Sequence, residues 1–150
     1  MTHAERAKNN FLNGYNCAQS VVLAFADEID VPEKILLAAV MPLGGGLGRL
    51  RETCGAVSGG AVALGLLFRD CPKAEMYAMV QELAHAFAAK NGTINCGQLL
   101  RGAGLPAETV PHPEERTQEY YRKRPCPELI FDAAGIVADI CRRRGRILSC

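Results

Sequence analysis

The chain has 150 residues, of which 49% are hydrophobic and 22% are charged, enough apolar side chains for a globular core. This composition excludes a disordered tail protein. The 17 Lys and Arg residues nearly balance the 16 Asp and Glu residues, and a formal charge of +1 lacks the positive field typical of nucleic-acid-binding proteins. We therefore expect a single domain over residues 1–150 that does not bind nucleic acid.

Helical periodicity dominates the sequence, and no segment alternates apolar and polar residues as a half-buried strand would. The pattern predicts an all-α fold, a compact single-domain bundle of about five to six helices. Apolar residues recur on one face of these helices, and Asn, Gly or Pro marks most of their ends. In chain order, the expected helices cover residues 4–12, 16–29, 32–41, 53–68, 73–90 and 127–144.

Two segments between these helices are predicted to be loops. The run Gly44-Gly45-Gly46-Leu47-Gly48 predicts a glycine-rich loop after the third helix. Residues 102–124 are rich in Pro, Glu and Arg, which predicts a surface loop with at most one short helical piece. Inside the fourth helix, Gly59, Gly60 and Gly65 each lower the intrinsic helix stability by about 1 kcal/mol relative to Ala. We therefore expect a neighbour to pack closely against that helix.

Seven cysteines are unusual for a chain of this length. Their number is odd, and residues 1–12 contain no apolar signal-peptide core, which favours a cytoplasmic protein over a secreted disulfide scaffold. No segment is long enough to span a membrane, since Pro42 and three glycines interrupt the apolar run over residues 35–47. In the cytoplasm thiols stay reduced unless they bind metal or perform redox chemistry.

Four cysteines fall at the start of an expected helix. Asn or Thr, both good N-caps, precedes the first three, and Pro follows the fourth. Unpaired backbone N–H groups and the helix dipole at such positions favour a thiolate and lower its pKa from about 8.5. Because thiolates attack disulfides and ligate metals, we predict that these four side chains converge on one site: Cys17, Cys54, Cys96 and Cys126.

The residues near these cysteines are compatible with a shared thiol site, although other roles for the cysteines stay open. The glycine-rich loop and Gly55 would let the backbone approach a cluster or a disulfide closely, and Arg49 and Arg51 would bring positive charge near Cys54. The sequence contains no CxxC pair, so it does not indicate a zinc ribbon, a bacterial ferredoxin or a thioredoxin-type centre. Free Cys is also a common small core residue, so the thiols could simply fill space.

With these motifs in order, the chain resembles the C-GCAxxG-C-C family of redox-active proteins over about residues 10–140. The stretch CGAVSG, residues 54–59, fits the family's Cys-Gly-Ala-x-x-Gly signature, and the order of the four cysteines fits as well. The resemblance implies a small helical protein of microbial redox metabolism. It assigns function to Cys17, Cys54, Cys96 and Cys126, puts Gly55 and Gly59 of the signature at the cofactor, and leaves Cys71, Cys141 and Cys150 as additional cysteines.

A similar domain occurs in split-Soret cytochromes, where it is associated with an iron–sulfur centre. This chain has no CxxCH motif, so the resemblance does not imply haem. The leading hypothesis is that the four thiolates bind an iron–sulfur cluster, possibly a two-iron one, that relays electrons to a redox partner protein. Alternatives with the same cysteines are reversible disulfides in a thiol–disulfide redox protein or sensor, and a structural zinc site. A helical interaction module without a cofactor, and a homodimer formed through the glycine-rich helix, are further possibilities.

Overall fold

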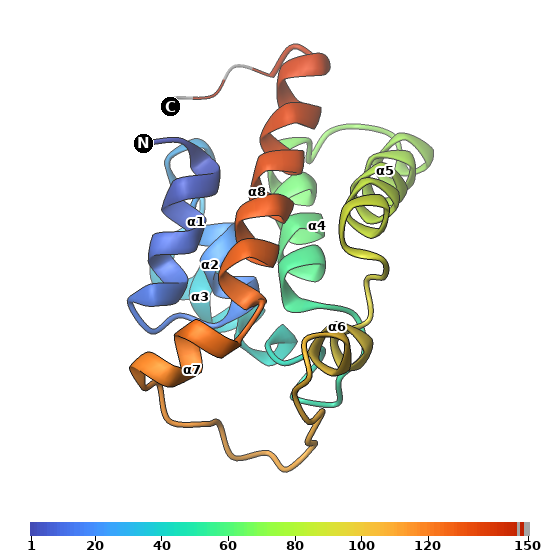
Figure 1. Cartoon of the computed structure of the whole chain (residues 1–150). Coiled ribbons are helices and arrows are strands. Elements are labelled where there is room, and N and C mark those ends of the chain that lie inside the picture. The colour runs from blue at the N-terminus through green and yellow to red at the C-terminus, as the bar shows by residue number, and fades with distance from the viewer. Residues whose placement is uncertain (147, 149–150) are drawn as a thin grey trace.

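The computed structural model describes residues 1–146 and 148 of the chain. Within them the fold consists of eight α-helices and two short 3-10 helices, with no strand longer than an isolated bridge (Figure 1). The prediction of an all-α fold is confirmed. The α-helices are α1 (His3–Leu12), α2 (Cys17–Leu23), α3 (Glu33–Val40), α4 (Gly55–Leu67), α5 (Lys73–Asn91), α6 (Cys96–Gly102), α7 (Gln118–Lys123) and α8 (Cys126–Arg143).

The expected number of five to six helices was too low, because two short helices have no long apolar pattern. An N-cap stabilises each of them: the side chain of Asn95 accepts from the backbone N–H of Gln98 in α6, and Thr117 accepts from Tyr120 in α7. The expected helix over residues 16–29 is also shorter. It ends at Leu23 and continues only as a 3-10 turn.

The core forms around α8, which packs against α1, α2, α4 and α5 (Figure 1). Its buried face includes Ile130, Val137 and Ile140, each with no exposed surface. The helix α4 packs against α2 so closely that a Cβ atom at Gly59 would lie 2.7 Å from the backbone of Ala18. This contact confirms the expected close neighbour of the glycine-rich helix.

The first turns of α2, α4, α6 and α8 lie at the same end of the bundle, the lower end in Figure 1. Backbone hydrogen bonds join two of these turns directly. The amide of Cys54 donates to the carbonyl of Ile94 at 2.7 Å, and the amide of Cys96 donates to the carbonyl of Glu52 at 2.6 Å. The starts of α4 and α6 are therefore fixed side by side, although they are far apart in the sequence.

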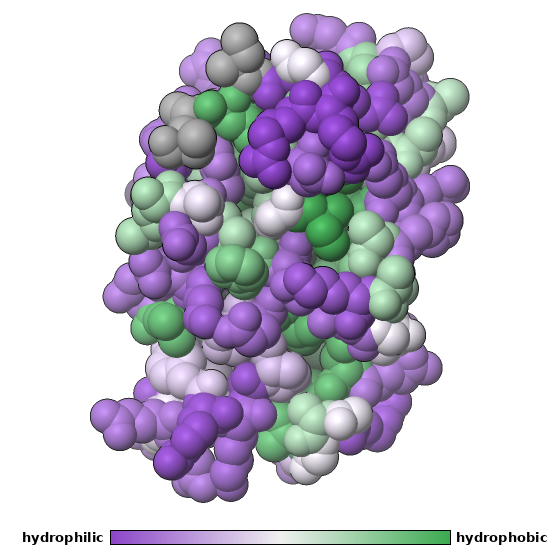
Figure 2. All heavy atoms as spheres, turned by 45° about the horizontal axis from the view of Figure 1, so that its top comes forward, coloured by the Kyte–Doolittle hydropathy of each residue, from purple (hydrophilic) through white to green (hydrophobic). Residues whose placement is uncertain are grey.

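The opposite end of the molecule has a different character. Figure 2 shows that the face around the end of α8 is predominantly hydrophilic, with apolar residues scattered over it. Three arginines at the end of α8 form ion pairs there, among them Arg143 with Glu82 and Arg144 with Glu75. Among the helices of the described residues, none has the length and apolar character needed to cross a membrane.

We expect Gly59→Ala to destabilise the protein by about 1–3 kcal/mol, because the new methyl group would overlap the backbone of Ala18. Gly65→Ala in the same helix is the matched control, since no atom lies within 4 Å of the added Cβ. This control should stabilise the protein by about 0.5–1 kcal/mol through helix propensity. Urea denaturation measures both changes, and equal stability of the two variants would contradict this packing.

Candidate functional site

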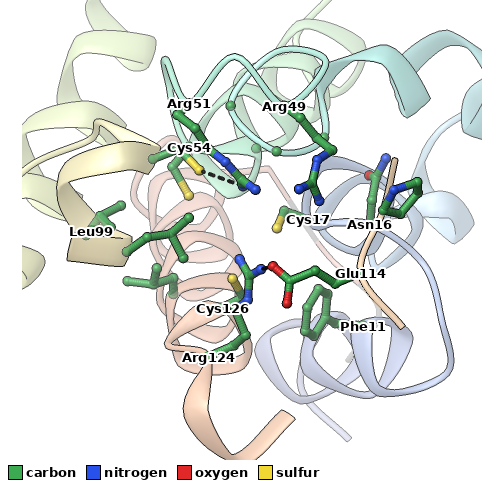
Figure 3. Close-up of a pocket in the computed structure, with 18 of the residues that line it drawn as sticks. Phe11, Asn16, Cys17, Arg49, Arg51, Cys54, Leu99, Glu114, Arg124 and Cys126 are labelled. Carbon is green, nitrogen blue, oxygen red and sulfur yellow. Dashed lines mark hydrogen bonds and ion pairs between the residues drawn. The ribbon is translucent and has the colours of Figure 1, made fainter. Parts of the chain in front are cut away.

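A cavity of about 430 Å³ lies where the first turns of α2, α4, α6 and α8 meet. Its wall contains all four cysteines that the sequence singled out, and we call it the thiol cavity. Figure 3 shows the side chains of Cys17, Cys54 and Cys126 directed toward its interior. Cys54 is buried, whereas the other three are half-buried. Four thiols from four separate helices thus share one space.

Local hydrogen bonds explain why the thiols meet. Asn16 caps α2 through a reciprocal pair of hydrogen bonds with Gln19, so Cys17 stands at the first helical position. The Asn16 side chain also donates to the carbonyl of Met41 at 2.9 Å, which ties the start of α2 to the chain preceding the glycine-rich loop. Cys126 begins α8 directly after Pro125.

The remaining cysteines lie elsewhere. Cys141 is buried in the core, and Cys71 stands before α5 in a separate surface hollow near Arg146. Neither lines the thiol cavity, and Cys150 lies outside the described residues. The two glycines of the signature that were expected at the cofactor have different positions. Gly55 lines the cavity, whereas Gly59 does not line it and packs against α2.

The four thiols do not share the lowered pKa that their helix-start positions predicted. Interaction with the Cys17 thiol lowers the pKa of Cys126 to about 7, and the positive charges of Arg124 and Arg116 act in the same direction against desolvation. The same interaction with Cys126, together with burial, raises the pKa of Cys17 well above its usual range.

Burial decides the protonation state of the other two thiols. It raises the pKa of Cys54 to about 12, and the nearby charge of Cys126 adds to this effect. Burial also raises the pKa of Cys96, even though Arg51 Nη1 donates to its sulfur at 3.7 Å. The expectation that Arg51 would favour a thiolate at Cys54 is therefore wrong, because the guanidinium lies against Cys96.

Arginine side chains form a second group in the cavity wall. Arg49 and Arg51 come from the segment beside the glycine-rich loop, and Arg116 and Arg124 come from the segment around α7. Sequence reasoning missed the second pair, because residues 102–124 carry no motif and were expected to form a surface loop.

Aromatic rings and backbone carbonyls hold Arg116 in place. Its guanidinium lies 4.3 Å from the ring centroid of Phe11 and donates to the carbonyls of Phe11 and Tyr15. The guanidinium of Arg124 lies 4.8 Å from the ring centroid of Tyr120. It also forms an ion pair with Glu114 (Figure 3). These contacts fix two positive charges beside the thiols of Cys17 and Cys126.

The glycine-rich loop allows close approach of its backbone to this site. A Cβ atom at Gly46 would lie 2.6 Å from Cβ of Cys96, and one at Gly55 would lie 2.9 Å from Cβ of Cys17. Side chains other than hydrogen do not fit at these two positions. The glycines therefore bring the backbone against two of the four cysteines.

The described cysteines are free thiols, with no disulfide among them. Within residues 1–146 and 148, no three His, Cys, Asp or Glu side chains are grouped closely enough to hold a single metal ion. One ion bound by these thiols would require them to move closer together.

Comparison with known proteins gives one match. The family model described as "Putative redox-active protein (C_GCAxxG_C_C)" matches residues 15–140, a range that includes all four cysteines of the thiol cavity. No curated protein and no solved structure matches the chain. The match covers most of the sequence, and the chain belongs to the C_GCAxxG_C_C family of redox-active proteins.

Proposed function

We propose that the protein exchanges electrons through a reversible disulfide between Cys126 and Cys17. The observation that carries this proposal is the position of the two thiols in the wall of one cavity, where each shifts the pKa of the other and Cys126 becomes the one that ionises near neutral pH. A reactive thiolate next to a protonated partner thiol is the arrangement that thiol–disulfide exchange uses.

The reaction begins with the sulfur of Cys126 attacking one sulfur of an external disulfide. The external S–S bond breaks, one half leaves as a thiolate, and the other half forms a mixed disulfide with Cys126. Cys17 then gives its proton to the departing thiolate, and its sulfur attacks the Cys126 sulfur of the mixed disulfide. The S–S bond to the external half breaks, and this second half leaves as a thiolate that takes a proton from water. The two cysteines are oxidised to one disulfide, and the external disulfide is reduced to two thiols.

The arginines supply the electrostatic support for the first step. Arg124 and Arg116 favour the thiolate of Cys126 at neutral pH, where an ordinary thiol is mostly protonated. Cys54 and Cys96 stay protonated because burial raises their pKa values. Attack through Cys126 is therefore favoured over attack through either of them.

A second function is favoured by a different observation, the presence of four thiols around one cavity. Four thiolates are the ligand set of a two-iron cluster, so Cys17, Cys54, Cys96 and Cys126 fit such a group by chemistry. Positive charge from the four arginines of the cavity wall would offset the negative charge of four thiolates. A bound cluster would supply single-electron transfer to a redox partner protein.

Purification without oxygen distinguishes the two functions. The thiol–disulfide proposal predicts a colourless protein in which mild oxidation removes the thiols of Cys17 and Cys126 and yields the peptide that links them. The cluster proposal predicts a coloured protein with stoichiometric iron and sulfide. A protein with neither property, whose thiols resist oxidation, would contradict both.

The reactivity of Cys126 should follow the ionisation of its thiol. We expect its rate of alkylation by iodoacetamide, followed by mass spectrometry of that residue, to rise with pH and reach half its maximum near pH 7. Arg124→Gln should move this midpoint upward, because it removes a positive charge that favours the thiolate. Arg122→Gln, a change of an exposed arginine outside the cavity wall, should leave it in place. A midpoint near 8.5 in the native protein would contradict the proposal.

Removal of the partner thiol should stop the reaction halfway. In Cys17→Ser the hydroxyl is close in size to the thiol but forms no disulfide, so we expect a stable mixed disulfide between Cys126 and the small molecule. Intact mass after mixing with a disulfide detects it. Cys71→Ser, outside the cavity, should release the small molecule as the native protein does. Release from Cys17→Ser at the native rate would mean that another thiol resolves the mixed disulfide.

A further inference from the structure

Two arginines of the cavity have no part in the thiol chemistry above. Arg49 and Arg51 line the thiol cavity, and their guanidinium groups point into it in Figure 3. The Arg51 residue is only 8% exposed. The Nη2 atom of each arginine is buried and has no hydrogen-bond partner among the described residues. Both side chains therefore keep donors available toward the cavity.

Other hydrogen bonds hold these guanidinium groups in position. Nε of Arg51 donates to the carbonyl of Glu108 at 2.8 Å, and Nε of Arg49 donates to the carbonyl of Val110 at 2.7 Å. These bonds come from the segment that precedes α7, which closes over the two side chains. The orientation of each guanidinium is set before any ligand arrives, which lowers the entropy cost of binding.

The backbone of this segment adds to the preorganisation. Residues 45–49 have consecutive positive φ angles between 54° and 71°, and Arg51 has a φ of 62°. Residues other than glycine rarely adopt this left-handed backbone conformation, yet both arginines do. Hydrogen bonds such as that from the amide of Arg51 to the carbonyl of Gly45, 3.1 Å long, stabilise the turn.

The charges of the cavity wall do not balance. Four arginines line it, but the acidic side chain in the wall is Glu114, which pairs with Arg124. Arg49 and Arg51 are near enough to repel each other, and burial together with this repulsion lowers the pKa of Arg49. Leaving the buried Nη2 donors of two neighbouring guanidinium groups unused is unfavourable unless an anion joins them.

We propose that Arg49 and Arg51 bind a carboxylate of a small-molecule disulfide and thereby select anionic disulfides as the substrates of Cys126. A guanidinium forms charge-assisted hydrogen bonds with a carboxylate, and the unpartnered Nη2 groups of Arg49 and Arg51 can each donate one to it. A volume of about 430 Å³ lies within the range of small-molecule sites. This inference rests on the proposed thiol–disulfide function.

Three disulfides of similar size test the selection: 3,3′-dithiodipropionate is anionic, bis(2-hydroxyethyl) disulfide is neutral and cystamine is cationic. The rate of Cys126 oxidation is measured at pH 8, above the pKa of about 7, so that the thiolate fraction hardly varies. We expect the anionic disulfide to react about tenfold faster than the cationic one. Equal rates, or a faster reaction with cystamine, would overturn the proposal.

Substitution of each arginine tests whether Arg49 and Arg51 cause the preference for the anionic disulfide. Arg51→Gln and Arg49→Gln should each slow the reaction with 3,3′-dithiodipropionate about tenfold more than they slow the reaction with the neutral disulfide. The control Arg122→Gln removes the same charge outside the cavity and should retain the native preference. A native preference in both Arg49→Gln and Arg51→Gln would contradict the assignment. If Arg51→Gln does not fold by circular dichroism, Arg49→Gln decides.

A redox-inert ligand separates failure of this inference from failure of the proposed function. Titration calorimetry with 3,3′-thiodipropionate, a thioether that carries the same two carboxylates, should detect binding that weakens about tenfold in Arg49→Gln. If this ligand binds and no disulfide oxidises Cys126, the anion site stands and the thiol–disulfide function fails. If disulfides react without regard to charge and the thioether does not bind, the function stands and this inference fails.

Discussion

The meeting of four helix starts at one end of the bundle is the constraint on which the site depends. Each cysteine of the thiol cavity stands at or just before the first turn of its helix, so the position of every sulfur follows from helix packing. The absent side chain of Gly59 allows α4 to lie against α2, and the hydrogen bonds around residues 52–54 and 94–96 hold α4 and α6 together. Loss of either contact would move sulfurs relative to one another without changing any cysteine.

Within that frame, unequal surroundings give the thiols unequal chemistry. Burial disfavours charge at Cys54 and Cys96, whereas the neighbouring Cys17 thiol and two arginines favour charge at Cys126. Once Cys126 is ionised, its negative charge raises the pKa of each of the other three thiols. One thiolate among four is therefore the electrostatically preferred state, which is why a pairwise reaction fits the cavity.

Local signals in the sequence were sufficient to predict the all-α fold and to single out the four cysteines that line the thiol cavity. Capping residues such as Asn16 and Asn95 act over three or four positions, so the helix starts are visible in the sequence itself. Burial and distant charge are not local. Arg116 and Arg124 meet Cys126 only after the segment around α7 folds back over the cavity, and no spacing in the sequence encodes that approach. The expectation of four lowered pKa values was wrong for the same reason, since it included the helix starts but not desolvation.

Proximity of the Cys17 and Cys126 sulfurs, inside a cavity that all four thiols share, is the central requirement of the proposed chemistry. A crystal structure of the reduced protein, prepared and frozen without oxygen, measures this directly. We expect those two sulfurs to lie near enough to form a disulfide with little movement, with Cys54 and Cys96 in the same wall and the guanidinium of Arg124 beside Cys126. Sulfurs dispersed over separate parts of the molecule would contradict it.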